Sequence, residues 1–171
     1  MNMDSTIIPH IIGTVTLLIL FSITGVYYSL SYSSLQSEIM VSNLQEVADY
    51  VSSEIVDLVS LGSLSAEGQL LIKELQLPEK IGGHVYNLTI TESGDTLKVQ
   101  VYLRSDPSVF GESILPWLIG GYIQPFNGTG ASINSTRITP QTTISSISKN
   151  PVVWCMRNSG KITFGFGVME A

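Results

Sequence analysis

The sequence predicts an α+β protein, with a long N-terminal hydrophobic and amphipathic α-helix followed by an antiparallel, β-sandwich-like globular head. Three observations lead to this fold class. Residues 5–37 contain no Asp, Glu, Lys or Arg. Apolar residues then continue at helical spacing to about residue 58, and beyond Gly82-Gly83 they alternate with polar residues, which is typical of strands.

The composition indicates a protein that prefers lipid or a packed assembly to water. The chain has 171 residues, of which 44% are hydrophobic and 13% charged, against roughly 25% charged residues in a typical soluble domain. The mean hydropathy is positive. The single cysteine, Cys155, excludes an internal disulfide framework and a multi-cysteine metal site.

The apolar segment over residues 7–30 is long enough to cross a bilayer, because 24 helical residues span about 36 Å. It is too long for the hydrophobic region of a secretory signal, and no basic leader precedes it. We therefore expect residues 6–30 to form a membrane-spanning segment or one that packs in an apolar assembly.

The helical pattern continues beyond this segment. The apolar residues recur at steps of three to five, with no Pro or Gly between Gly25 and Gly62, at Leu35, Ile39, Leu44, Val47, Val51, Ile55 and Leu58. We expect one helix over about residues 6–61, with an amphipathic continuation over 31–61. On its polar side lie Glu46, Asp49 and Asp57, with Glu54 nearby, either as a solvated face or as an acidic strip that binds a partner.

The chain after the helix divides into a linker, residues 62–83, and a β-rich head, residues 84–171. Within the linker, residues 67–77 predict a short helix that Pro78 ends. In the head, two hairpins are predicted, and the polar stretch 127–148 is expected to be exposed loop or edge strand. The hairpins join 85–91 to 97–103 and 152–156 to 162–169.

Charge is distributed unevenly along the chain. Residues 1–72 hold seven acids and no Lys or Arg, whereas residues 113–169 hold no acid. Four bases lie in the acid-free part: Arg137, Lys149, Arg157 and Lys161. The two parts are expected to attract each other within or between subunits. Neither has the dense basic patch of a nucleic-acid-binding protein, so no nucleic-acid partner is indicated.

Residue types suited to catalysis are few, and we predict that the protein is not an enzyme. His10 lies in the apolar helix, His84 lies at the start of the head, and a Cys155–His84 nucleophile pair is supported by residue type alone. No nucleotide-binding or metal-ligand motif is present in the sequence. We predict no catalytic, cofactor-binding or metal-binding residues and no cofactor.

Three N-glycosylation sequons follow the apolar segment, at Asn87, Asn127 and Asn134. They favour a glycosylated head outside the cytoplasm, although a polar composition can produce such triplets by chance.

The order of these elements resembles the type IV pilin family, and the archaeal pilins and archaellins more than the bacterial ones. In residues the resemblance rests on 7–59, with Ile11-Ile12-Gly13-Thr14 near the start of the apolar helix. It implies a structural subunit of an extracellular filament, with N-terminal helices in the core and β heads as the outer wall. The residues it assigns to filament-core packing are Ile7, Ile11, Gly13, Leu17, Leu18, Phe21, Gly25 and Tyr28.

The resemblance also implies partners and a location. The chain would associate with itself into a helical homopolymer at the cell surface, after insertion in the cytoplasmic membrane. We expect the filament to serve adhesion to a surface or host-cell ligand, with motility, conjugation and DNA uptake as alternatives. The competing prediction is a single-pass, membrane-anchored envelope or archaellum accessory protein with an extracytoplasmic β-sandwich head.

Overall fold

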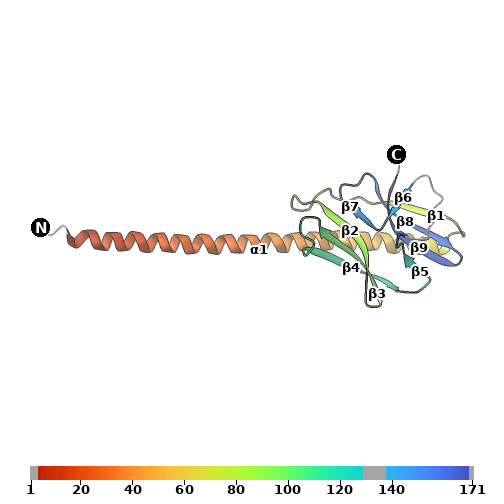
Figure 1. The fold of residues 1–171 in the computed structure, drawn as a ribbon, viewed down its shortest axis with the longest axis horizontal. Helices are drawn as coiled ribbons and strands as arrows, with labels where there is room; N and C mark the ends of the chain where they lie inside the picture. Colours follow the sequence, from red (N-terminus) through yellow and green to blue (C-terminus); the bar gives the residue numbers. More distant parts are fainter. Residues whose placement is uncertain (1–3, 129–137, 170–171) are drawn as a thin grey trace. The chain divides into compact units, whose positions relative to one another are not determined.

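The structure is a computed structural model that describes residues 4–128 and 138–169 (Figure 1). The chain divides into two compact units, residues 1–39 and residues 40–171, and the division falls within helix α1 (Asp4–Leu64). The predicted helix over residues 6–61 is therefore confirmed and is slightly longer at both ends.

Strands fill most of the chain after the helix. Their bounds are β1 (Leu70–Glu74), β2 (Tyr86–Ser93), β3 (Thr96–Leu103), β4 (Phe110–Leu118), β5 (Ile123–Pro125), β6 (Ile138–Gln141), β7 (Thr143–Ser145), β8 (Pro151–Asn158) and β9 (Lys161–Met169).

Two sheets result from their pairing. One is antiparallel throughout, in the order β4-β3-β2-β7. The other has the order β1-β8-β9-β5, and β6 also pairs with β9. In this second sheet β5 runs parallel to β9, so it is mixed rather than purely antiparallel as predicted. The α+β class is confirmed, with one mixed and one antiparallel sheet.

Both predicted hairpins are present, and their turns have suitable chemistry. In the β2–β3 turn Gly94 has a φ of 60°, the conformation that a two-residue hairpin loop requires at its first position. In the β8–β9 turn Ser159 and Gly160 both have positive φ, at 52° and 75°. Within the polar stretch 127–148, the described part contains β6 and β7, and β7 is an edge strand as predicted.

The predicted short helix over residues 67–77 is wrong, because this segment contains strand β1. Leu70 to Glu74 pair with β8 in antiparallel register, from Leu70 opposite Met156 to Glu74 opposite Val152. A helix of that length is marginal in isolation, whereas a strand against β8 satisfies its backbone and packs Leu71 on the core.

One hydrophobic core joins the second half of α1 to both sheets. The helix contributes a buried stripe. The antiparallel sheet contributes residues such as Tyr86 and Val99, and the mixed sheet contributes residues such as Cys155 and Phe164. The stripe consists of Leu44, Val47, Ala48, Val51, Ile55, Leu58 and Val59. It begins later than predicted, since Leu35 and Ile39 are exposed.

The helix backbone approaches the edge strand β4 very closely at Gly111. A Cβ atom on Gly111 would lie 2.6 Å from the carbonyl carbon of Leu44. Next to this contact the Gln45 side chain donates to the Glu112 carbonyl oxygen at 2.8 Å and accepts from the Glu112 amide at 3.1 Å. Helix α1 and strand β4 are therefore joined by the close backbone approach at Gly111 and by two hydrogen bonds between the Gln45 side chain and the Glu112 backbone.

We predict that Gly111→Ala lowers the free energy of unfolding by about 1–3 kcal/mol, the usual cost of overpacking against backbone. Urea denaturation of the full chain in detergent, followed by near-ultraviolet circular dichroism, measures this. Gly13→Ala is the matched control, because a Cβ there meets nothing within 4 Å. An unchanged midpoint for Gly111→Ala would contradict the close approach.

Candidate assembly surface

The residues assigned to filament-core packing are exposed wherever the structure describes their side chains. Their exposed fractions are 55% for Ile11, 58% for Leu17, 62% for Leu18, 69% for Phe21 and 69% for Tyr28. A Cβ on Gly13 or Gly25 would meet nothing within 4 Å. The Ile7 side chain lies outside the described residues. Within the described chain, none of these side chains has been brought into the core.

Exposure is not confined to one face of this segment. Five consecutive residues, from Leu17 to Phe21, are each between 54% and 69% exposed. The helix is long and apolar enough to cross a membrane, and none of its most apolar stretch is buried within the described chain. A helix that is apolar on all sides needs lipid or other helices around it.

Hydroxyl groups in the apolar segment are satisfied by the helix itself. Thr16, Ser22 and Thr24 each donate to the carbonyl oxygen four residues earlier, at 2.8 Å in every case. All three hydroxyl hydrogens are therefore already bonded. The segment can enter an apolar environment without the cost of removing water from an unbonded hydroxyl donor.

The polar side of the second half of α1 is acidic, as predicted. Glu46, Asp49 and Asp57 are exposed. Glu54 is half-buried and forms an ion pair with Lys73 of β1. The hydrogen bond to Glu54 raises the pKa of Lys73 above its ordinary value. The charge of Asp57 also helps to raise the pKa of Lys73, so Glu46 and Asp49 are the two of these four acids without a basic partner in the contacts described for this face.

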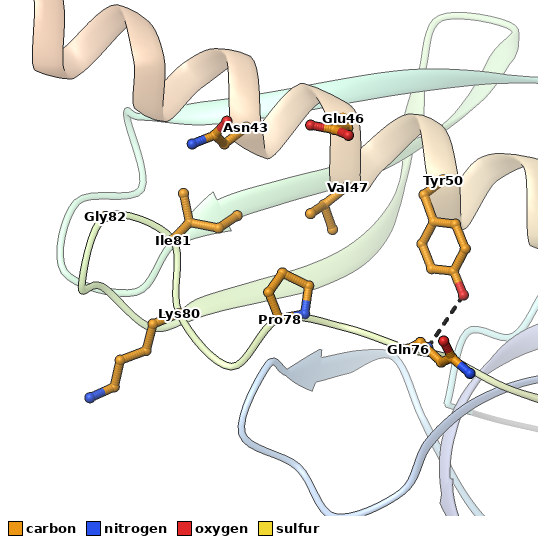
Figure 2. Close-up of a pocket in the computed structure, with 9 residues that line it drawn as sticks. All are labelled: Asn43, Glu46, Val47, Tyr50, Gln76, Pro78, Lys80, Ile81 and Gly82. Atoms are coloured by element: carbon orange, nitrogen blue, oxygen red, sulfur yellow. Dashed lines mark hydrogen bonds between the residues drawn. The ribbon is translucent and has the colours of Figure 1, made fainter.

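An open groove of about 390 Å³ lies between α1 and the chain that leads from β1 to β2 (Figure 2). Tyr50 lies at one end, where its hydroxyl oxygen accepts from the Gln76 amide at 3.3 Å. Glu46 and Lys80 add one acid and one base to the lining. The lining includes no histidine, cysteine or serine.

The structure does not bring Cys155 and His84 together as a catalytic pair. Cys155 is fully buried, and its Sγ donates to the Leu58 carbonyl oxygen at 3.4 Å. His84 is exposed, with Nδ1 3.3 Å from the Ser105 hydroxyl oxygen. Burial raises the pKa of the Cys155 thiol to about 11, which disfavours the nucleophilic thiolate. Among the described residues, no group of three or more His, Cys, Asp or Glu side chains is placed to hold a metal ion.

The three sequons lie in different surroundings. Asn87 is half-buried near the start of β2, between Tyr102 of β3 and Ser145 of β7. Asn127 is exposed after β5. Asn134 lies outside the described residues. Accessibility thus favours Asn127 over Asn87 as a glycan acceptor.

Sequence reasoning missed an apolar row on β4. Ile114 and Leu118 are 63% and 66% exposed, and Pro116 between them is also exposed. Residues 114–119 are all apolar, so the sequence shows a continuous apolar run and no alternation that would mark an outward-facing row. The two prolines and two glycines of residues 116–125 further obscured the row.

Comparison with protein-family models, with curated proteins and with solved structures finds no match for this chain.

The buried thiol gives a pH-dependent prediction. Because its pKa is raised from 9.0 to about 11, the fold stabilises the protonated form. That contribution is complete below the unfolded pKa and is lost as the pH rises through about 11. We expect iodoacetamide at pH 8 to label native Cys155 roughly 100-fold or more slowly than the unfolded chain. We also expect the urea midpoint to fall between pH 9 and 11. Equal labelling rates with and without urea would contradict the buried position.

Proposed function

We propose that this chain is the structural subunit of an extracellular, type IV pilus-like filament of the archaeal pilin type. In this proposal the apolar segments of α1 pack together as the filament core, and β-sandwich-like heads form the outer wall. The subunit is held in the cytoplasmic membrane before assembly, and the filament serves surface adhesion. Its role is assembly rather than catalysis.

The observation that supports this proposal is the contrast within α1. Its second half gives a complete stripe to the head core, whereas residues 11–32 expose apolar side chains throughout. Burying such a segment among copies of itself contributes on the order of tens of kcal/mol before entropy and lost lipid contacts are subtracted. A single surface can therefore serve in the bilayer and in the filament.

A second candidate is a single-pass, membrane-anchored envelope or archaellum accessory protein. The length and hydropathy of the apolar segment support it equally, since one bilayer crossing also covers the segment. The two candidates differ in where the mature chain is found. Shearing the source cells, pelleting the appendages and examining the pellet by electron microscopy and intact-mass analysis distinguishes them.

We predict that Leu18→Lys abolishes filaments, because an ammonium group in a packed apolar core is left without a partner. Electron microscopy of sheared appendages measures the loss, and a membrane blot verifies insertion. Leu64→Lys, in the same helix at a position 86% exposed, should leave filaments intact. If the lysine variant fails to insert in the membrane, the uncharged Leu18→Gln variant provides the test in its place. Normal filaments from both Leu18 variants would refute the packed core.

We also predict that assembly weakens as salt rises. The acids at Glu46, Asp49 and Asp57 are exposed, and so are Lys149 and Lys161 in the acid-free part of the chain. If these surfaces meet between subunits, salt screens their attraction, since the Debye length falls to about 3 Å at 1 M. Sedimentation of filaments from 0.05 to 1 M salt tests this, and an unchanged pelleted fraction would count against it.

A further inference from the structure

The exposed side of β4 carries an apolar strip that the head itself does not cover. We call Ile114, Pro116 and Leu118 the β4 strip. The strip side chains alternate with inward ones: Leu115 is 1% exposed, and the Trp117 ring packs on Phe164 at a centroid distance of 5.4 Å. Because the inward residues are fixed in the core, the strip is held facing outward.

The surroundings of the strip are apolar or neutralised. Residues 113–128 contain no charged side chain. The turn after β4 adds Ile119 and Tyr122, which are 37% and 61% exposed. Lys98, which lies opposite Ile114 on β3, donates to Glu112 at 2.7 Å. The strip and the turn after it are uncharged, which lowers the desolvation cost of covering them.

Strand addition is a poor way to cover this edge. The Glu112 amide and carbonyl are already bonded to the Gln45 side chain. Pro116 has no amide hydrogen to donate to a further strand. Backbone pairing along β4 is thus interrupted at Glu112 and Pro116, so we expect a partner to contact the strip through side-chain packing.

The strip lies on a bulge of β4, because Leu118 is opposite Thr96 and Ile114 is opposite Lys98, so four steps along β4 correspond to two steps along β3. It is therefore a short apolar cluster that neighbouring side chains on one face of a helix can cover. The chain itself provides an uncharged, exposed apolar helix of sufficient length over residues 11–32.

We propose that the β4 strip is the surface on which the apolar segment of α1 from a second copy of this chain packs. The proposal rests on the proposed filament function and names the contact between head and core. It joins two different surfaces of identical chains, and such a heterologous contact extends into an open polymer instead of closing a dimer.

Photo-crosslinking of the full chain in its source cells tests this contact. Benzoylphenylalanine replaces Ile114 or Leu118, the cells are irradiated, and products with the mass of two chains are mapped by mass spectrometry. Ile147, an apolar residue 53% exposed outside the strip, is the matched control position. We expect two-chain products from positions 114 and 118 that are joined to residues 11–32, and a several-fold lower yield from position 147.

Paired substitutions provide a second readout. Ile114→Asp combined with Leu118→Asp should reduce sheared filaments by about tenfold or more, as loss of a central apolar contact does in other interfaces. Ile147→Asp should not change filament yield. Urea midpoints equal to wild type for both variants would show that the fold is retained, which the exposure of these side chains predicts.

The outcomes separate this contact from the filament proposal. Filaments present with crosslinks joined to residues 84–171, or with no yield above position 147, would overturn the strip contact and leave the filament proposal standing. If the paired variant unfolds, the crosslinks alone decide. Without filaments, products joined to residues 11–32 would still support the contact, and their absence would overturn both.

Discussion

The structure of the head depends on the burial of one stripe of α1. Leu44, Val51 and Ile55 are at most 1% exposed, and they belong to the same core as residues from both sheets. Removing the helix would expose the apolar inner residues of the two sheets together, so the second half of α1 is a core element and not a stalk. The compact unit accordingly begins at Met40, well inside the helix.

This constraint explains why the two halves of α1 differ in the pattern of their apolar and charged side chains. Where α1 belongs to the core it has a buried stripe and an acidic exposed side, as an amphipathic helix of a folded domain does. Over residues 11–32 it has neither, and its apolar side chains are exposed. This segment is where the proposed contacts with lipid or with other copies would lie.

Sequence reasoning predicted the parts of this fold that local periodicity determines. Helical spacing gave α1 within a few residues, and alternation with turn residues gave the β2–β3 and β8–β9 hairpins. It missed β1, because five strand residues beside β8 are defined by a partner more than 75 positions away. The parallel pairing of β5 and the contact at Gly111 have the same non-local origin. Of the proposed assembly surface, the helix was predicted and the β4 strip was not.

The edge of β4 shows how a chain with so much exposed apolar surface can associate without forming sheets across molecules. An open edge strand with apolar side chains is an aggregation hazard when its backbone is free. Here Gln45 occupies the Glu112 amide and carbonyl, and Pro116 provides no donor. Backbone pairing is interrupted at these two positions, whereas the outward side chains are exposed, and side-chain packing depends on shape in a way that backbone pairing does not. The same helix that forms the core of the head thus also restricts how the head can meet its neighbours.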